Sequence, residues 1–395
     1  MARHYYLTRS GRLRRKDNTL LFELSEDAEE NKLSNNSEAS ELAEEMLSNI
    51  GQNLGEDNLG NILLEEEVPD LSEILNAENE IEKETGAPVR VKEKRVIPVE
   101  DVDAIWSFRE LNLNSKVINF LAQKKIPVHF FNYYGFYTGS FYPREYLQAG
   151  FLLVRQVKHY SSNIKRLRIA KELISASLHN ILRNLRYRDS RGIDLLTETE
   201  GVQAEVLRLD GVKQINELMA CEGRARAAYY QAFEKIIKRD VEFKKRVRRP
   251  PDNMVNALIS FTNGLVYSSV LTQIYRSQLD PTISFLHEPG FRRFSLALDL
   301  AEVFKPVLAD RLIFRLFNNG QLSEKHFAQD LNCCYLKESG RKIVLKEWDA
   351  RLNTTIEHRR LKRKVSYERL IRLECYKLVK HLTEVEEYKG FRAWW

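Results

Sequence analysis

Three side chains in the second half of the chain are of types that hold divalent cations in proteins. His287 lies on a loop rich in glycine and proline, and Asp299 and Glu302 follow it with a spacing of three positions. Helix positions i and i+3 share one face, so a helix here would present both carboxylates together. A loop imidazole aimed at two carboxylates is a workable half-site for a divalent metal.

A carboxylate that could complete this half-site is Glu222, which lies in a segment with a helical apolar face. Gly223 and several alanines keep the surface beside Glu222 thin, so another element can approach it closely. Each feature alone has an ordinary explanation, because a lone histidine is usually structural and an acidic pair is usually solvated. The combination favours a metal site over those separate explanations.

At these residues the chain resembles the CRISPR-associated integrase, the metal-dependent endonuclease of the spacer-acquisition module. Five segments carry the resemblance: 5–23, 126–145, 221–233, 248–271 and 285–311. The resemblance implies that Glu222, His287 and Glu302 are both the metal ligands and the catalytic residues. It also places Asp299 and Lys305 at the neighbouring acidic and basic positions of the same motif, as supporting residues, and Lys305 could support the phosphate.

The activity that this resemblance implies is insertion of short foreign DNA fragments, or spacers, into a CRISPR repeat array for antiviral defence. A 3′-hydroxyl of the fragment would attack a phosphodiester at the repeat edge, and water in its place would give nuclease activity. The implied cofactor is Mg²⁺ or Mn²⁺, and one imidazole ligand suits Mn²⁺ better. The implied partners are double-stranded DNA, a second copy in a homodimer, and a small ferredoxin-like subunit of the same module.

Three other functions are compatible with parts of the sequence. A transposon-encoded integrase relative would share the motifs but integrate its own element. A non-catalytic DNA-binding scaffold of the same fold would not need the intact ligand set. A basic helical protein of the membrane surface would explain the composition alone, but the loop histidine and the carboxylates do not fit it.

The charge of the 395-residue chain is unevenly distributed. The formal net charge is +6, yet segment 24–88 carries −17, because 19 acidic residues oppose two basic ones, and the remainder carries +23. Such a basic body suggests a polyanionic partner, with nucleic acid ahead of anionic lipid. No uninterrupted run of about 18 apolar residues and no apolar leader are present, so we expect neither a membrane span nor secretion. Four cysteines without a CxxC pair are typical of reduced thiols in a cytoplasmic protein.

The sequence predicts an α+β fold with a small β-sheet domain followed by a larger all-α catalytic domain. Residues 1–142 would form the β domain, which mediates dimerisation by resemblance and is interrupted by an acidic insertion at about 24–88. Residues 143–395 would form the helical domain. Its predicted helices are 144–159, 161–188, 198–208, 211–239, 251–277, 295–305, 306–317, 322–329, 346–359 and 366–386. Segment 253–275, apolar nearly all round, should be the central buried helix.

Particular residues are expected to begin helices, end them or contact DNA. Ser295 should cap the helix that carries Glu302, and Pro306 should end or kink that helix. Asn256 lies near the expected metal site, although structural hydrogen bonding is the more conservative interpretation. Basic runs at 235–249 and 358–372 could follow a DNA backbone, or they could be ordinary solvated surface. The predicted DNA contacts are Arg224, Lys244, Lys245, Arg246, Arg248, Arg249, Arg292 and Arg293.

Overall fold

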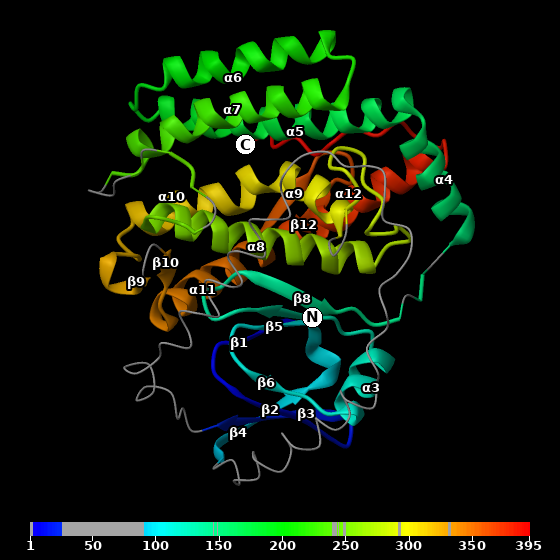
Figure 1. Ribbon diagram of the computed structural model, residues 1–395, viewed down its shortest axis with the longest axis vertical. Coiled ribbons are helices and arrows are strands. Elements are labelled where there is room, and N and C mark those ends of the chain that lie inside the picture. The colour runs from blue at the N-terminus through cyan, green and yellow to red at the C-terminus, as the bar shows by residue number, and fades with distance from the viewer. Residues whose placement is uncertain are drawn as a thin grey trace, which may run out of the picture.

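Two small sheets at one end of the molecule support a larger layered set of helices (Figure 1). The computed structural model describes residues 3–25, 91–144, 146–147, 149–238, 243, 245–247, 250–290, 294–330 and 333–395. The expected α+β class is confirmed, with strands in the N-terminal part and mainly helices after it. The predicted insertion at 24–88 lies outside the described residues except for Leu24 and Ser25, which end a strand.

The N-terminal strands form two four-stranded sheets. In the first sheet β1 pairs with β5 and β5 with β7 in parallel, whereas β7 and β8 form an antiparallel pair. Its order is β1 (Arg3–Leu7), β5 (Val102–Ser107), β7 (Val128–Phe131) and β8 (Tyr137–Phe141). The order of the second sheet is β4 (Val91–Pro98), β3 (Thr19–Ser25), β2 (Gly11–Lys16) and β6 (Leu111–Asn112).

Strand alternation builds a separate small core in this N-terminal part. Leu13 on β2 is fully buried while its neighbours Arg12 and Arg14 are exposed, as the period of two requires. Leu13 belongs to an apolar cluster with residues of the first sheet and of α3 (Ser115–Gln123). The Asn114 side chain accepts the Val117 amide at 3.0 Å and so caps this helix.

The two ends of the acidic insertion meet in the second sheet. Ser25, at the end of β3, pairs with Val91, at the start of the antiparallel neighbour β4. The intervening residues 26–90 therefore connect two adjacent strands. An insertion at such a position can change in length without altering the sheet register.

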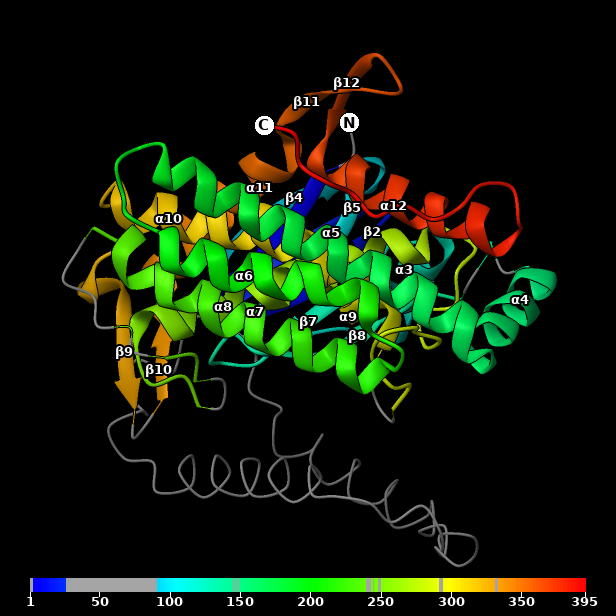
Figure 2. The same ribbon diagram turned by 90° about the horizontal axis from the view of Figure 1, so that it is seen from above.

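The remaining chain is mostly helical, as predicted. Its helices are α4 (Gly150–Ser161), α5 (Asn163–Asp189), α6 (Leu196–Arg208), α7 (Ile215–Ile236), α8 (Met254–Tyr275), α9 (Ser295–Lys305), α10 (Arg311–Asn318), α11 (Glu338–Asn353) and α12 (Tyr367–Leu382). Figure 2 shows α5, α6 and α7 running side by side in front of the other elements. Short turns at η2 (Val99–Asp101), η3 (Leu209–Gly211) and η5 (Glu324–His326) separate some of these elements.

Helix α8 is the central buried helix that its uniform apolarity predicted. Its length and mean hydropathy would suffice for a membrane span, but 78% of its most apolar window is buried inside the molecule. It packs against the first sheet, where Trp106 donates its indole N–H to Ser268 at 2.8 Å. The His129 ring is hydrogen-bonded to Thr272 on the same helix at 2.8 Å. These contacts join the sheets to the helical part.

The helix predicted at 144–159 starts later, at Gly150. Two further predicted helices include residues that form strands. The helix predicted at 322–329 is wrong, because this region forms the hairpin of β9 (Phe327–Asp330) and β10 (Cys333–Leu336). The helix predicted at 346–359 starts earlier, as α11, and gives way to the hairpin of β11 (Thr355–His358) and β12 (Arg363–Ser366). Short segments acquire strand structure from their pairing partners, which local periodicity does not reveal.

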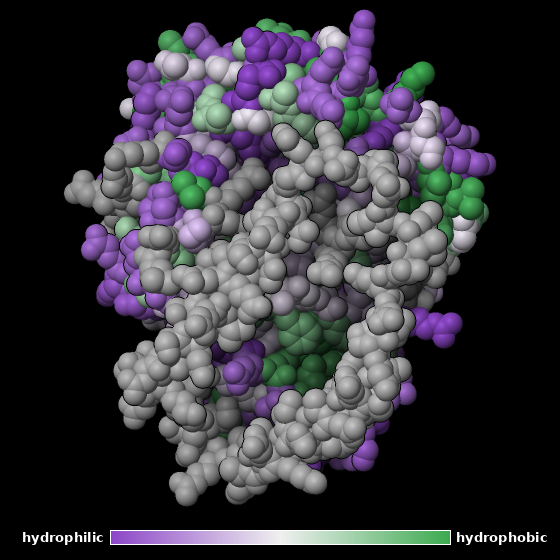
Figure 3. All heavy atoms as spheres, viewed as in Figure 1, coloured by the Kyte–Doolittle hydropathy of each residue, from purple (hydrophilic) through white to green (hydrophobic). Residues whose placement is uncertain are grey.

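Helix α4 exposes an apolar face at one edge of the molecule. Phe151, Val154 and Val157 are 58%, 52% and 45% exposed, and Figure 3 shows green side chains at this edge. The upper edge, over α6, is predominantly hydrophilic by comparison.

Candidate active site

Glu222 lies on α7 and is held by an arginine on the next turn of the same helix. Arg226 donates its Nε–H to Glu222, and its Nη2 donates to Glu302 on α9. Arg226 is buried, with 7% of the residue exposed, and its guanidinium bridges two carboxylates from different helices. The carboxylates of Glu222 and Glu302 are therefore close enough for one cation to contact both.

Glu302 is buried among cations. Lys305, one turn further along α9, donates to its Oε1, while Arg226 contacts Oε2. Burial alone would raise the pKa of Glu302, but the charges of Arg226, Lys305 and His287 lower this pKa to about 2. Glu302 is therefore a carboxylate at neutral pH, which is the form that binds metal ions.

His287 is oriented by Asp299, which lies on α9 opposite the loop. The ring nitrogen Nδ1 of His287 is hydrogen-bonded to Asp299 Oδ1 at 2.8 Å. The same carboxylate accepts the main-chain amides of Phe285, Leu286 and His287 at 2.6, 2.8 and 3.0 Å. Asp299 is fully buried, so its charge is compensated by these donors. This arrangement leaves Nε2 as the nitrogen of His287 that can face an ion.

Side chains from α4 and α5 hold the loop that carries His287. Arg166 donates to the carbonyl oxygen of Phe285 at 2.9 Å and to the carboxylate of Glu288 at 2.6 Å. Tyr160 donates to the other carboxylate oxygen of Glu288 at 2.9 Å. Earlier in the same loop, Gln156 donates to the main-chain carbonyl of Asp280 and accepts the main-chain amide of Asp280. The loop is thus fixed on both sides of the imidazole.

The start of α9 differs from the predicted cap. Ser295 is the first residue of the helix, and its hydroxyl donates to the carbonyl oxygen of Thr282 at 2.7 Å instead of capping. Phe294 stands at the cap position without a side-chain hydrogen bond to the helix. Ser295 therefore fastens α9 to the preceding loop, which the local sequence pattern could not distinguish from a cap.

The end of α9 is where Pro306 was predicted to interrupt it. A π-helical turn, η4 (Pro306–Asp310), follows and leads into α10. Asn180 on α5 donates to the carbonyl of Val303 at 2.9 Å, and Asn184 donates to that of Pro306 at 2.8 Å. These amide side chains satisfy carbonyl groups near the interrupted helix end and hold the Glu302 turn against α5.

Two residues that sequence reasoning missed lie beside the carboxylates. Arg226 is the bridging cation, and its signal was a position four residues after Glu222 on the same helix face. Asp310 lies in the π-helical turn, where burial raises the pKa of its carboxyl group to about 7. Its electrostatic neighbours include Arg226 and Glu302. A π-helical turn is often associated with a functional site, but no sequence pattern predicted this one.

The structure unites the predicted ligands only in part. Glu222 and Glu302 contact one guanidinium, and the charge of His287 acts on Glu302. Among the described residues, one group of three potential ligands has its donor atoms within 4.8 Å of one another, and this group is not the predicted triad. Arg226 stands between the two carboxylates. The donor set of two carboxylates and one oriented imidazole nevertheless fits a divalent cation, which would take the role of the guanidinium charge.

The family of the chain follows from comparison with known proteins. The family model described as CRISPR associated protein Cas1 matches residues 75–350. The chain belongs to the Cas1 family. A curated relative, the CRISPR-associated endonuclease Cas1 of Fusobacterium nucleatum, is 50% identical over 303 residues, which cover 77% of this chain and 90% of that protein.

Solved structures share the fold over nearly the whole chain. A CAS1 protein from Thermotoga maritima has a TM-score of 0.74 and 33% identity, covering 98% of this chain and 99% of that one. A casposase bound to integration product has a TM-score of 0.75 and 18% identity, with coverages of 98% and 92%. A Cas6-RT-Cas1–Cas2 complex has a TM-score of 0.71 and 15% identity, with coverages of 99% and 36%. The last two similarities establish the fold alone.

Three of the predicted DNA-contact residues, Arg224, Lys245 and Arg246, lie within the described part of this Cas1 chain. Lys244, Arg248, Arg249, Arg292 and Arg293 lie outside the described residues. Arg224 forms two hydrogen bonds with Glu205 on α6, at 2.9 and 2.8 Å, so it joins α6 to α7. This ion pair gives Arg224 a structural role, and its contact with DNA stays a prediction.

Asn256 forms hydrogen bonds with Lys245 and Arg246, the other two predicted DNA-contact residues that the structure describes. Its side chain donates to the carbonyl of Lys245 at 3.0 Å and accepts a hydrogen bond from Arg246 at 3.0 Å. Asn256 is completely buried near the start of α8. The conservative interpretation as a structural hydrogen-bonding residue is therefore supported, and the residue acts by holding the basic segment on the helix. Tyr230 lies within electrostatic range of both Arg246 and Arg226, so this segment is near the carboxylates.

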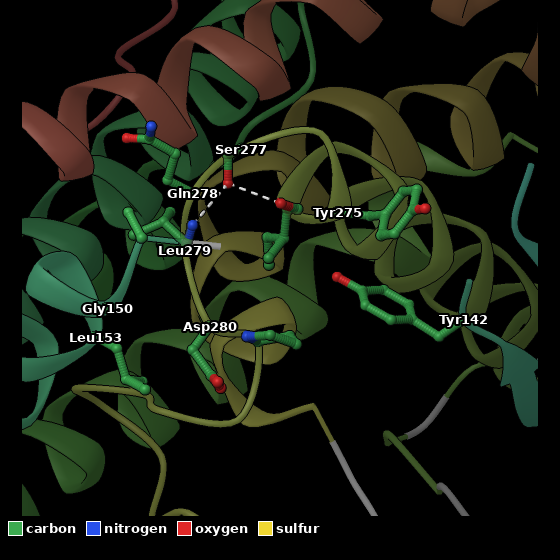
Figure 4. A pocket seen from close by; sticks show the side chains of 11 residues that line it. Tyr142, Gly150, Leu153, Tyr275, Ser277, Gln278, Leu279 and Asp280 are labelled. Carbon is green, nitrogen blue, oxygen red and sulfur yellow. Dashed lines mark hydrogen bonds between the residues drawn. The ribbon is translucent and has the colours of Figure 1, made fainter. Parts of the chain in front are cut away.

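A pocket elsewhere on the Cas1 fold is separate from this site. It opens between the start of α4, the end of α8 and loop 277–281 (Figure 4). The rings of Tyr142 and Tyr275 meet edge to face there with centroids 4.8 Å apart. Its lining, within the described part of the chain, includes none of the predicted metal ligands. The candidate site is therefore the carboxylate cluster between α7 and α9.

Proposed function

We propose that this chain is a metal-dependent DNA integrase and endonuclease that inserts short foreign DNA fragments into a CRISPR repeat array. The observation that carries the proposal is the bridge from Arg226 to Glu222 and Glu302, beside an imidazole oriented by Asp299. Membership of the Cas1 family supports the reaction class. We place this activity in the cytoplasm, where the repeat array would be.

The proposed metal ligands are Glu222, His287 and Glu302, and the proposed ion is Mg²⁺ or Mn²⁺. A bound ion would polarise the scissile phosphate and lower the pKa of the attacking hydroxyl. The low pKa of Glu302 keeps its carboxylate ionised in advance. Asp299 holds the ring of His287 by Nδ1, so Nε2 is available without reorientation. The single nitrogen ligand favours Mn²⁺ on ligand softness.

The proposed reaction is transesterification at phosphorus. The oxygen of a fragment 3′-hydroxyl forms a bond to phosphorus at the repeat edge and loses its proton to solvent. The bond from phosphorus to the original 3′-oxygen breaks, and that oxygen takes up a proton. Water as the nucleophile gives hydrolysis instead. Lys305 and Arg226 supply positive charge beside Glu302, where a phosphate could approach, so the chain's part is to position reactants and neutralise charge.

The proposed assembly contains double-stranded DNA, two copies of this chain and a small ferredoxin-like partner subunit. We propose that residues 1–142 form the dimerisation domain and residues 143–395 the catalytic domain. The fold shared with a Cas1–Cas2 complex and with a DNA-bound casposase supports a partner subunit and a DNA substrate. The formal charge of +23 outside segment 24–88 supports phosphate binding.

A casposase-like role is the second candidate, because a casposase shares the fold over 98% of this chain. The CRISPR role is favoured by the 50% identity to a CRISPR-associated relative, compared with 18% to the casposase. The DNA beside the gene would distinguish the two roles, because a repeat array indicates the CRISPR role and transposon ends indicate the casposase-like role. A non-catalytic scaffold is disfavoured by the retained donor set.

Strand transfer by the purified full chain tests the proposal. A short duplex with 3′-hydroxyl ends and a labelled repeat-containing target should give a joined product with Mn²⁺ or Mg²⁺. Glu222→Ala, His287→Ala and Glu302→Ala should each abolish joining yet bind DNA nearly as well, because the basic surface is unchanged. Glu234→Ala, at an exposed position of the same helix α7, is the matched control.

The chemistry of the donor end separates integration from hydrolysis. Fragments with 3′-dideoxy ends lack the nucleophile, so they should give no joined product while metal-dependent cleavage continues. Joining that persists in all three alanine variants would overturn the proposed ligand set. DNA binding without any metal-dependent product would identify a scaffold instead of an enzyme.

A further inference from the structure

A second cluster of metal-ligating side chains lies where the first sheet meets the C-terminal helices. His4 on β1, Asp103 on β5 and Glu368 on α12 have donor atoms that all lie within 4.8 Å of one another. The Nε2 atom of His4 is 3.3 Å from Asp103 Oδ2 and 3.5 Å from Glu368 Oε1. These residues come from distant parts of the sequence, and none belongs to the candidate active site.

The spacing of these atoms matches the edges of a metal coordination polyhedron. Metal–ligand bonds of about 2.0–2.2 Å to nitrogen and oxygen place tetrahedral ligands about 3.3–3.6 Å apart. The two measured separations from Nε2 fall in this range. A cation could therefore be bound by small side-chain adjustments, without a change in the backbone.

Asp103 directs one of its two carboxylate oxygens at His4. The residue is 7% exposed, and its Oδ2 has no hydrogen-bond partner among the described residues, although it faces His4. Arg276 binds the other oxygen, Oδ1, and the main-chain carbonyl of Asp103. Arg276 thus orients the carboxylate and leaves Oδ2 directed at the cluster. A buried carboxylate oxygen that faces only an imidazole across 3.3 Å can bind a cation in place of the proton on that imidazole.

The other two ligands are also held in place. Gln273 on α8 donates to Glu368 Oε1 at 2.9 Å, an oxygen that can still accept a further bond. The ring of His4 lies against Trp106, with centroids 4.7 Å apart, and its Nδ1 faces the Tyr6 hydroxyl at 3.4 Å. Asp349 on α11 lies 4.0 Å from the same Nδ1. The Tyr6 hydroxyl and the Asp349 carboxylate thus lie on the Nδ1 side of the ring, and Nε2 faces Asp103 and Glu368.

We propose that His4, Asp103 and Glu368 form a second divalent-metal site, distinct from the proposed catalytic one, which ties the N-terminal sheet to α12. One imidazole and two carboxylates in a compact, partly buried geometry suit Zn²⁺ better than Mg²⁺, which prefers oxygen ligands and retains its waters. The site's role is structural, because its ligands are enclosed by α8, α11, α12 and the first sheet.

The main competitor for this site is a proton. Burial alone would lower the pKa of His4, but Asp103 and Glu368 raise it to about 9. Arg276 and Arg372 are further cations beside the cluster, the latter 4.0 Å from Glu368. Without metal the cluster is a network of ion pairs around an imidazolium. The same carboxylates that retain the proton would retain a divalent cation in its place.

Zinc stoichiometry in a background without the proposed catalytic site tests the inference. The full-length Glu222→Ala/His287→Ala variant, dialysed against buffered Zn²⁺, should retain one zinc ion per chain. Adding His4→Gln should weaken this zinc affinity at least tenfold. Adding His159→Gln, which replaces a buried histidine on α4, should leave it unchanged.

A second variant and a spectroscopic probe guard against a folding defect in His4→Gln. Glu368→Gln keeps the side-chain shape and removes one anionic ligand. Co²⁺ bound by the same background should show visible ligand-field absorption, and Glu368→Gln should diminish it without changing the far-ultraviolet circular dichroism. Equal zinc content and equal Co²⁺ spectra in all variants would show an ion-pair cluster only and overturn the proposal.

Discussion

Ser177 on α5 donates a hydrogen bond of 2.8 Å to the main-chain carbonyl oxygen of Glu302 on α9. In an uninterrupted helix this oxygen would accept the amide of residue 306, but Pro306 has no amide hydrogen. A side chain of a neighbouring helix therefore replaces the missing backbone donor. This hydrogen bond holds the main chain of Glu302, the residue whose carboxylate contacts Arg226. It therefore fixes the backbone beneath the candidate site.

Ser177→Ala should consequently destabilise the protein. The change leaves a buried carbonyl without its side-chain donor, which costs about 1–3 kcal/mol in the free energy of unfolding. Urea denaturation measures the difference, and strand transfer should fall with it because the Glu302 turn is loosened. Ser175→Ala, on the more exposed side of α5, should change the unfolding free energy by no more than about 0.5 kcal/mol. Equal costs for the two variants would remove this role from Ser177.

Asp299→Asn should weaken metal binding without changing any proposed ligand. The carboxylate orients His287 and accepts three main-chain amides, whereas an amide side chain would direct a donor at one of these groups. We expect a loss of about 10–100-fold in Mn²⁺ affinity, the usual effect of altering a ligand's outer partner. Mn²⁺ titration by electron paramagnetic resonance measures it directly. Asp210→Asn, remote from the loop, provides the comparison, and unchanged Mn²⁺ affinity in Asp299→Asn would contradict the assignment.

Arg166→Ala should release the loop that carries His287. It removes donors to Phe285 and Glu288 and leaves the loop held by Asp299 and Gln156. We expect faster amide hydrogen exchange at residues 285–288 and about tenfold weaker Mn²⁺ affinity. Arg168→Ala, which removes an exposed arginine of the same helix, should affect neither measurement. If exchange in the loop is equally slow in both variants, Arg166 is not its anchor.

The free energy of unfolding should decline at alkaline pH in protein kept free of metal by a chelator. The folded-state pKa of His4, about 9, exceeds the ordinary histidine value of about 6.5. Protonated His4 therefore contributes on the order of 3 kcal/mol to the free energy of unfolding. This contribution is complete below about pH 6.5 and is lost as pH rises through 9. His4→Gln should remove this part of the decline, whereas His159→Gln should retain it. Superimposable pH profiles for wild type and His4→Gln would refute the assignment.

The acidic insertion should weaken non-specific DNA binding if it competes for the basic surface. Residues 24–88 carry −17 on a chain whose remainder carries +23, and tethering raises their effective concentration to the order of millimolar. Deleting residues 26–90 and joining Ser25 to Val91 through a short turn preserves the strand pair. If the insertion competes with DNA, the variant without residues 26–90 should bind random DNA more tightly than the full chain at low salt. This difference in affinity should diminish as salt screens the charges. Equal affinities throughout a salt titration would make the insertion a silent spacer.

Sequence reasoning was sufficient for features that depend on local pattern. Spacing of apolar residues predicted most helices, including α8, and proline chemistry predicted the end of α9 at Pro306. Motif resemblance identified the family, which the comparisons confirmed. The ligand assignment to Glu222, His287 and Glu302 stays a prediction. Local patterns were insufficient for the two short hairpins, because strand formation there depends on pairing partners.

Only the tertiary structure decided how distant side chains combine. Asp299 resembled a second metal-facing carboxylate in the sequence, yet it faces back onto the loop and orients His287. Arg226 reaches Glu302 across 76 positions of the sequence, and His4, near the start of the chain, contacts Glu368, near its end. Charge–charge contacts of this kind depend on which buried surfaces the packing brings together. Sequence spacing determines the face of a helix on which a residue lies, whereas packing determines which other side chains that face meets.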